Sequence, residues 1–272
     1  MNSLVVDAES NLRLVVFVVL FTALSLAEIA FPRRTLLFPR TVRWRTNIAI
    51  SVFNTLIVRI AVPLAGVGAA LFAQQEQWGI FPVIRNYFQL PQWASIIIFL
   101  FIFDLTIYYQ HRVFHAVPFL WRFHRVHHTD MDYDITTGIR FHPVSIIISS
   151  YIKILLIMFM GVSAMAVVIA EILLNATSMF NHSNLKLAPK LESFLRLFLV
   201  TPDMHRIHHS SNAVEHNHNF GFNFPWWDRL FNTYIDKPEK SLEEINIGIE
   251  GINKKDSMSL FSLLSQPFRR AE

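Results

Sequence analysis

Residues 144–176 read VSIIISSYIKILLIMFMGVSAMAVVIAEILLNA, and this long apolar block decides the fold. As one helix its 33 residues would measure roughly 50 Å at about 1.5 Å per residue, whereas a bilayer core is about 30 Å thick. We therefore predict a hairpin of two short helices that bends near Gly161 and returns the chain to the side from which it entered. One long tilted helix is the alternative.

Three further apolar stretches lie before this block, at residues 14–31, about 47–73 and 93 to about 109. Each is near the roughly 20 residues that a helix needs to cross a bilayer. The second contains Arg59 and Pro63. We predict an all-α fold, an integral membrane helical bundle with about four membrane-embedded elements: three spans plus the hairpin.

The composition agrees with a membrane protein. Hydrophobic residues make up 53% of the 272 residues and charged residues only 16%, against about a quarter charged in soluble domains. The net charge of +4 is small and scattered, which suits an anionic membrane surface and gives no basis for nucleic-acid binding. Cysteine is absent, which excludes disulfides, thiolate zinc sites, iron–sulfur clusters and haem-thiolate chemistry.

Basic residues predict the orientation. The loop between the first and second spans carries Arg33, Arg34, Arg40, Arg43 and Arg45, and the next loop carries only Arg85. Because cytoplasmic loops are enriched in Lys and Arg, the first loop is predicted to be cytoplasmic. The third span then ends on that side near His111, and the hairpin keeps the rest of the chain there. We predict a cytoplasmic, histidine-rich, metal-binding cap.

Eight of the twelve histidines form three clusters. These are His111-Arg-Val-Phe-His115, His124-Arg-Val-His127-His128 and His205-Arg-Ile-His208-His209. On a helix, residues three and four apart share a face, so each cluster offers its imidazoles to one point. Imidazole suits iron, zinc, copper and nickel. Eight ligands exceed one tetrahedral site, so we predict two metals in one shared site. Ligation by histidine without thiolate favours iron that activates oxygen.

Other chemistries lack their signatures. No Glu stands beside a cluster histidine as His-Glu-x-x-His hydrolysis requires, and Gly-x-Gly-x-x-Gly and the P-loop are missing. Electrons must therefore come from a separate donor. A metal transporter with a histidine-rich loop and a structural zinc protein remain alternatives. His216 and His218, taken singly, are interpreted as ordinary histidines.

The order of these clusters, with a hydrophobic hairpin before the last, resembles the fatty acid hydroxylase/sterol desaturase superfamily. The sequence around the clusters also resembles motifs of that superfamily. These motifs lie at residues 104–112, 120–128, 140–143, 180–184, 201–209 and 219–229. The likeness covers about residues 104–234. We therefore predict one membrane-embedded domain, residues 1–272, with a catalytic histidine-box region at 104–234.

This resemblance implies an integral membrane diiron enzyme that uses O₂ to hydroxylate or desaturate a C–H bond of a lipid or sterol-like substrate. It implies a separate electron donor of cytochrome or ferredoxin type with its reductase, and a bacterial inner membrane or endoplasmic reticulum. It also implies catalytic metal-ligand roles for eight residues: His111, His115, His124, His127, His128, His205, His208 and His209. His182 matches a further ligand position.

The ligand set departs from the family in one place. Fatty acid 2-hydroxylase members have a histidine four residues before His182, where this chain has Ser178. His142, in an Arg-x-His-Pro block of sterol-type members, could supply the missing imidazole or could lie beside the metals without binding them. Asp104 and Asp228 are predicted to accept the second N–H of a metal-bound imidazole; helix capping or interfacial polarity is the alternative.

Overall fold

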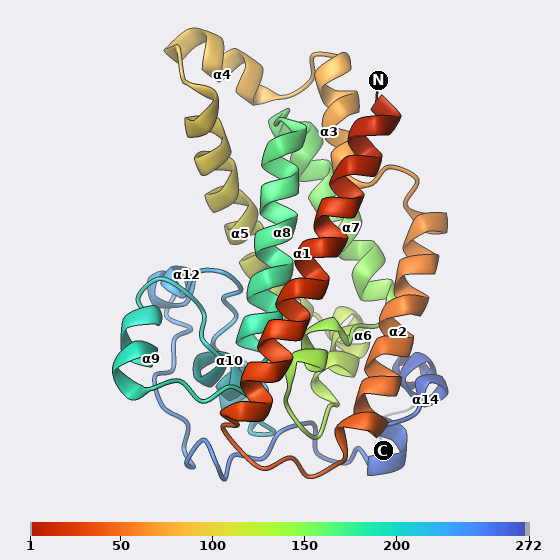
Figure 1. The fold of residues 1–272 in the computed structure, drawn as a ribbon, viewed down its shortest axis with the longest axis vertical. Helices are drawn as coiled ribbons and strands as arrows, with labels where there is room; N and C mark the ends of the chain where they lie inside the picture. The colour runs from red at the N-terminus through yellow and green to blue at the C-terminus, as the bar shows by residue number, and fades with distance from the viewer. Residues whose placement is uncertain (1, 270–272) are drawn as a thin grey trace.

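The computed structural model describes residues 2–269, so residue 1 and residues 270–272 of the predicted single domain lie outside the described residues. Between residues 2 and 269 the chain is helical, and its only β-type pairings are two isolated bridges. Figure 1 shows long helices that run side by side and a cap of short helices at the end where the C-terminus lies. The all-α prediction is confirmed.

The long helices and their connections come first. They are α1 (Asn2–Ala30), α2 (Arg40–Ala61), α3 (Gly66–Gln75), α4 (Ile80–Phe88), α5 (Gln92–Ala116), α6 (Pro118–His128), η1 (Ile135–Ile139), α7 (Pro143–Met160) and α8 (Ala164–Asn181). The cap follows. It contains α9 (Pro189–Leu195), α10 (Pro202–His208), α11 (Ala213–His216), α12 (Trp226–Leu230), α13 (Lys254–Ser257), α14 (Leu260–Ser265) and η2 (Gln266–Phe268).

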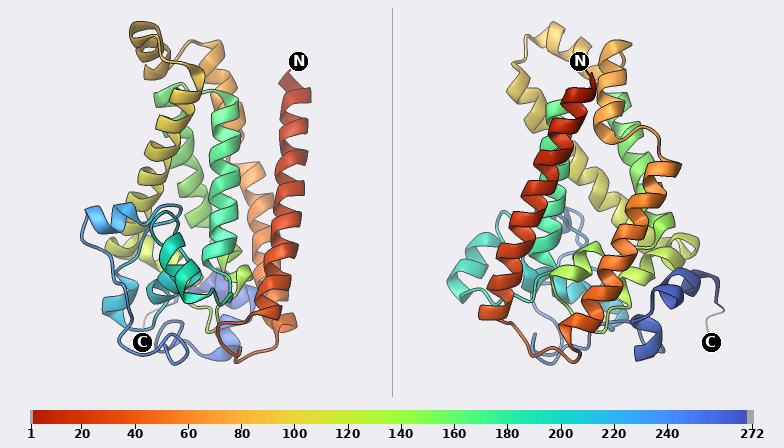
Figure 2. Two further views of the ribbon diagram at one scale, coloured as in Figure 1. Left: turned by 60° about the vertical axis from the view of Figure 1, so that its left-hand side comes forward. Right: turned by 45° about the vertical axis from the view of Figure 1, so that its right-hand side comes forward.

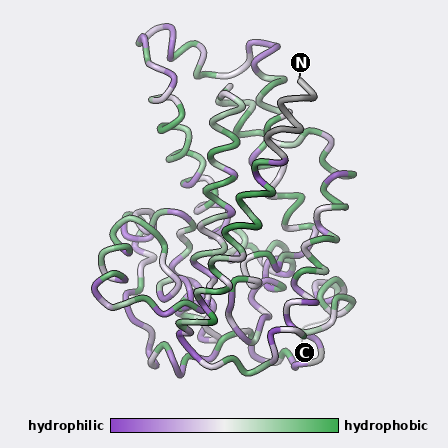
Figure 3. The backbone as a smooth tube through the Cα atoms, viewed as in Figure 1, coloured by the Kyte–Doolittle hydropathy of each residue, from purple (hydrophilic) through white to green (hydrophobic). Residues whose placement is uncertain are grey.

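Five helical segments among the described residues are long and apolar enough to cross a bilayer. They are Asn11–Ala30, Arg40–Gln75, Gln92–Ala116, Pro143–Met160 and Ala164–Asn181. Figure 3 shows hydrophobic residues along these helices and a mixed pattern in the cap. The chain is therefore a multi-pass membrane protein. Each arm of the predicted hairpin has 18 residues, about 27 Å of helix, so each is long enough to span. The three predicted spans and the two arms of the hairpin correspond to the five segments.

The predicted bend at Gly161 is confirmed. α7 ends there in the left-handed conformation, with φ at 63°, and the Gly161 N–H donates to the carbonyl of Ile157 at 2.9 Å. A Cβ on Gly161 would also collide with the carbonyl oxygen of Trp78. The turn therefore needs glycine for its backbone angle and for space. The segments after α8 accordingly lie at the end of the bundle opposite the N-terminus (Figure 2).

The second apolar stretch differs from its prediction. We expected residues 47–73 to form one element, but the helix stops at Ala61 and resumes at Gly66. Pro63 lies in the break, because proline has no N–H to donate and its ring collides with the preceding turn. The third span is longer than predicted: α5 continues past Tyr109 to Ala116, and its last turns carry the first histidine pair.

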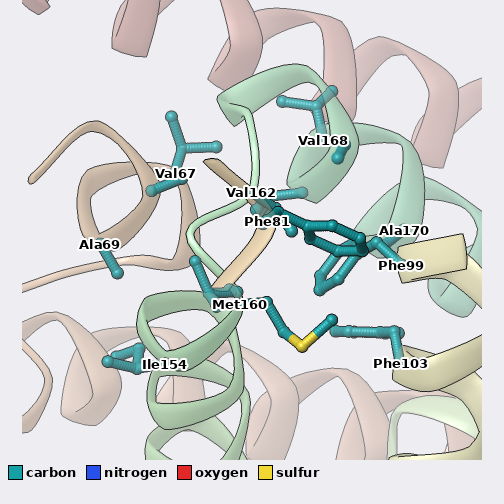
Figure 4. Close-up of a cluster of buried hydrophobic side chains, with 14 of the residues drawn as sticks. Val67, Ala69, Phe81, Phe99, Phe103, Ile154, Met160, Val162, Val168 and Ala170 are labelled. Carbon is teal, nitrogen blue, oxygen red and sulfur yellow. The ribbon is translucent and has the colours of Figure 1, made fainter. Parts of the chain in front are cut away.

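A hydrophobic core joins α3, α4, α5, α7 and α8 in the part of the bundle away from the cap. Phe81 from α4, Phe99 and Phe103 from α5 and Met160 from α7 meet there (Figure 4). All four side chains are at most 3% exposed. This packing fixes the far ends of the helices whose near ends carry the histidines. α1 packs on α8 at the side of the bundle.

Two glycine variants test the hairpin. Gly161→Ala incurs the left-handed backbone penalty of about 1–2 kcal/mol and also the collision with Trp78. Gly251 has φ at 80°, but no atom lies within 4 Å of the place that a Cβ would occupy. Gly251→Ala therefore incurs the backbone penalty alone. Thermal unfolding in detergent should show a larger loss of Tm for Gly161→Ala. Equal losses would show that the close approach is unimportant.

Candidate metal centre

Nine histidines meet where the bundle joins the cap. They form two groups, and within each group the candidate ligand atoms lie within 4.8 Å of one another. The first group is His111, His115, His124, His128 and His208; the second is His127, His182, His205 and His209. The two groups touch, since the His128 and His209 rings stack with centroids 4.5 Å apart. The structure thus brings all three sequence clusters and His182 together.

Local sequence sets each cluster on a helix. α5 carries His111 and His115, and Pro118 begins α6, which carries the second cluster. Thr201 caps α10 by accepting from the Met204 N–H at 3.3 Å, and Pro202 is the first helical residue. Proline is favoured there because its fixed φ suits a helix start. This start turns the third cluster toward the other two.

Main-chain carbonyls hold the Nδ1 atoms of four imidazoles. The pairs are His111 with Phe220 O at 2.9 Å, His127 with Arg140 O at 3.1 Å, His182 with Ser178 O at 2.7 Å and His208 with His218 O at 2.8 Å. A carbonyl can only accept, so Nδ1 carries the hydrogen and Nε2 keeps its lone pair. Each Nε2 is thereby available as a ligand atom.

Several Nε2 atoms face one another. His182 Nε2 lies 3.1 Å from His127 Nε2 and 3.1 Å from His205 Nε2. In the other group, His115 Nε2 and His128 Nε2 are 3.2 Å apart. Lone pairs at this separation repel each other unless a cation or a proton lies between them. This arrangement is typical of a metal site.

Other ring nitrogens are buried without a partner among the described residues. They include Nε2 of His111 and His208 and both nitrogens of His124 and His209. A buried polar atom without a partner costs free energy, and a bound cation would remove that cost. Nitrogen donors without thiolate suit first-row divalent metals such as iron and zinc. The residues present therefore fit a metal centre.

Burial keeps the imidazoles that lie outside the membrane-spanning helices neutral. Desolvation lowers the pKa of His182 to about 3. It also lowers the pKa values of His124, His127, His205 and His209 well below the usual 6.5, and neighbouring histidines add to the effect. Neutral imidazole is the form that binds metal.

Asp104 and Asp228 act differently from the prediction, because neither carboxylate contacts an imidazole. Asp104 accepts from the N–H groups of Asn223 and Phe224 and from the Trp227 indole. These bonds tie the loop at 219–224 to α5. The predicted contact with a metal-bound histidine is therefore wrong for Asp104.

Asp228 braces the other side of this loop. It accepts from Phe220 N at 2.8 Å, Gly221 N at 2.7 Å and Thr233 Oγ1 at 2.7 Å. Its predicted contact with an imidazole is also wrong. However, Asp228 holds the main chain of Phe220, and the Phe220 carbonyl holds His111, so Asp228 positions that ring indirectly. Burial raises the pKa of Asp228 to about 6, against the three hydrogen bonds that favour the ionised form. A Cβ on Gly221 would lie 2.7 Å from the Asp228 carboxylate, so this contact requires glycine.

A buried ion network holds the second cluster, and sequence reasoning missed it. Arg43 of α2 donates to Asp130 at 2.8 and 3.0 Å. Burial acts to raise the pKa of Asp130, but the charges of Arg43 and Arg140 outweigh it and lower the pKa below its usual value. Arg140 donates to the Val126 carbonyl at 3.0 Å, and its own carbonyl accepts from His127. The run of Asp130, Asp132 and Asp134 directly after the second cluster was the available signal.

His142 lies outside both groups. Its Nδ1 accepts from the Val144 N–H at 3.2 Å and caps α7, and its Nε2 lies 3.2 Å from the Leu264 carbonyl. The expected ligand role is corrected, because both ring nitrogens already have partners. Ser178, where the resemblance to fatty acid 2-hydroxylase members implies a histidine, instead supplies the carbonyl that holds His182. His216 stacks on Trp121 with centroids 5.5 Å apart and belongs to neither group.

A cavity of about 500 Å³ opens beside the histidines, within the usual range of about 300–1,000 Å³ for small-molecule sites. α2, α5, α7 and α8 supply most of its wall, and His111, His124 and His127 line it too. Both histidine groups therefore face one space inside the bundle.

The fold and site define a membrane protein with a histidine-rich metal-binding centre, and comparison with known proteins agrees. The family model for fatty acid hydroxylase matches residues 96–233, about half the chain. The chain therefore belongs to the fatty acid hydroxylase family. No solved structure matches it significantly.

Two kinds of relative are informative. Ornithine lipid hydroxylase OlsE of Rhizobium tropici is 26% identical over 96% of this chain and 78% of its own length. Human alkylglycerol monooxygenase is 31% identical over 57% of this chain, and the Xenopus tropicalis protein is 29% identical over 61%. The chain spans only 35% of the length of these two animal proteins.

The lowered histidine pKa values predict retention of metal in mild acid. A free imidazole with pKa about 6.5 is mostly protonated at about pH 5.5. Here protons compete only as the pH falls through the lowered values, so metal content after dialysis at about pH 5.5 should equal that at neutral pH. Elemental analysis measures it. Loss with a midpoint near 6.5 would contradict the burial argument.

Asp228→Asn tests the loop brace. Asn retains one acceptor oxygen but presents an NH₂ group to a backbone N–H, so the loop that holds His111 should loosen. We expect metal affinity to fall by up to about tenfold, the low end of the effect of outer hydrogen-bond partners. Metal retained against a chelator measures this. Asp236→Asn, at an exposed carboxylate, is the matched control and should retain metal.

Proposed function

We propose that this protein is a membrane-bound, O₂-dependent diiron oxidoreductase that hydroxylates a C–H bond of a lipid. Its nine grouped histidines, on a cavity inside the bundle of a fatty acid hydroxylase family member, are the observation that carries the proposal. The hydroxylase and monooxygenase names of the relatives support it. Residues 104–234 would form the catalytic region of one membrane-embedded domain.

The ligand set we propose is five histidines for one iron and four for the other, as the two groups divide. The chain's part is to hold neutral imidazoles in place through carbonyl hydrogen bonds, so that no ring must turn when metal binds. Iron bound there would supply the oxygen activation that an unactivated C–H bond requires. The protein itself would bind the lipid, orient its reacting C–H bond and keep water away from the metals.

Exclusion of water is built into the cavity wall. Phe114, Phe141 and Phe222 line the cavity beside the histidines. Phe141 stacks on the His127 ring with centroids 4.3 Å apart. Apolar rings at this point would keep competing water from the oxidising centre.

We propose that electrons come from a separate donor of cytochrome or ferredoxin type with its reductase, since the sequence carries no nucleotide-binding motif. We place the metal centre on the cytoplasmic side of a bacterial inner membrane or endoplasmic reticulum, on the basis of the arginine-rich first loop. Desaturation by the same centre is the second candidate, because the outcome depends on where the substrate lies.

His205→Ala with a histidine control tests this function. Wild-type protein should contain about two iron ions per chain, one for each group, and cells that express it should contain lipids heavier by one oxygen. Loss of two hydrogens instead would indicate desaturation. His205→Ala should lower iron content and abolish the lipid change. His218→Ala removes a side chain outside both groups but keeps the main-chain carbonyl that holds His208, so it should do neither. Elemental analysis and lipid mass spectrometry are the measurements; zinc alone with no lipid change would refute the proposal.

A further inference from the structure

The wall of the cavity carries ionised groups within the membrane-spanning helices. Besides the histidines, Arg13, Arg59, Lys153 and Glu171 line it. Arg13 forms an ion pair with Glu171. Arg59 is exposed where α2 nears its end, so it lies at the mouth of the cavity. Three cations face one anion in this wall.

Lys153 makes no hydrogen bond or ion pair with the side chains that the structure describes, those of residues 11–254 and 256–269, and the open space beside it is the cavity. It lies on α7 ten residues after Pro143, about 15 Å along the helix from the level of the histidines. A charged side chain at this depth in a bilayer is costly unless it is paired, and such residues usually mark a ligand pathway. The missing partner would be an anion in the cavity.

A stripe of hydroxyl groups leads toward this lysine. Ser145, Ser149 and Lys153 are spaced four residues apart on α7, so they share one helix face, and all three line the cavity. The Ser145 hydroxyl is buried with no hydrogen-bond partner among the described residues. Hydrocarbon cannot satisfy such groups. The occupant of this face should therefore carry oxygen atoms that accept hydrogen bonds.

We propose that the cavity binds the oxyanion, carboxylate or phosphate, of an acidic or zwitterionic membrane lipid at Lys153, with Arg59 at the mouth. The inference rests on the proposed function and narrows its substrate class to lipids that carry such an anion. The anion would fix one end of the lipid. The part of the lipid next to it, with oxygen atoms such as those of an ester, ether or hydroxyl group, would extend along the Ser149–Ser145 face toward His111, His124 and His127. Lys153 is thus a residue that determines specificity.

An anion site at Lys153 reduces the number of lipid classes that fit the cavity. A sterol carries a hydroxyl as its polar group and would leave the charge of Lys153 unpaired. An alkane or a carotenoid would leave the serine hydroxyls unpaired as well. A lipid with a carboxylate or phosphate pairs the charge of Lys153, and further oxygen atoms next to that anion can accept from the serine hydroxyls. We therefore exclude sterols as the preferred ligand.

Lipid binding to the full chain, as purified in detergent micelles, tests the inference without turnover. The probes are oleate and dioleoyl phosphatidic acid, compared with uncharged oleyl alcohol and dioleoylglycerol, at a pH where the acids are ionised. Thermal shift and native mass spectrometry measure binding. The anionic lipids should bind about tenfold more tightly than their uncharged analogues, about 1.4 kcal/mol.

Lys153→Met should abolish this preference, and Lys153→Arg should keep it. The methionine variant should unfold at the same or a higher temperature without lipid, because it removes an unpaired charge, so lost binding cannot be attributed to misfolding. Lys240→Met, at an exposed lysine of the cap, is the matched control and should bind as wild type does. Equal binding of oleate and oleyl alcohol, or an unchanged preference in Lys153→Met, overturns the inference.

Inorganic phosphate separates a lipid source from a water-borne anion. It should not compete with oleate, because the site opens inside the bundle; competition overturns the assignment to a lipid. The proposed function can fail independently. A protein that contains only zinc, or that changes no cellular lipid, can still show the Lys153-dependent preference, and an active diiron enzyme can lack it.

Discussion

The structure depends on hydrogen bonds between the Nδ1–H groups of buried histidines and main-chain carbonyls. Nine imidazoles gathered without water would be unstable if each were free to turn or to take a proton. Four carbonyls fix the tautomer of four rings, and burial keeps the rings neutral. Among the residues that the structure describes, the lone pairs that result have no partner except one another. The metal-binding character of the site follows from that deficit, and the precision of the site depends on the backbone that supplies the carbonyls.

Two of those carbonyls, those of Phe220 and Arg140, belong to residues that charged groups hold in place. Asp104 and Asp228 grip the loop at 219–224 from opposite sides through five main-chain and side-chain N–H groups and one hydroxyl. Arg43, Asp130 and Arg140 form a buried ionic network beneath the second cluster. A buried ion pair is weak as a source of net stability, but it is directional and costly to break. These acids therefore serve to position backbone, and the backbone positions the rings.

The cavity inside the bundle has an apolar end at the histidines and a polar, charged region farther along α7. At one end of the cavity, phenylalanine rings and neutral imidazoles suit oxidation away from water; farther along α7, serines and Lys153 suit an anion. Lipid hydroxylation needs both properties, because the reactive carbon must lie at the metals while some other part of the molecule fixes its position. Binding energy gained at a distant charged group can thus be used to orient the reacting bond.

The sequence by itself determined the all-helical membrane bundle, the turn at Gly161 and the three histidine clusters, because apolar length and helical spacing are local properties that neighbouring residues encode. Residue spacing alone could not separate His142 from His182, since both are single histidines near helix ends. The resemblance favoured His182, and only the fold shows that His142 caps α7 while His182 joins the second group. The sequence also could not show that Asp104 and Asp228 grip a loop, that Arg43 reaches Asp130, or that Lys153 faces the cavity of the histidines. Asp104 and Arg43 reach partners 119 and 87 positions away, and such pairings are decided by the packing of helices in three dimensions. The partners of Asp228 lie only eight and seven positions back, but the shape of the loop between them decides whether they meet.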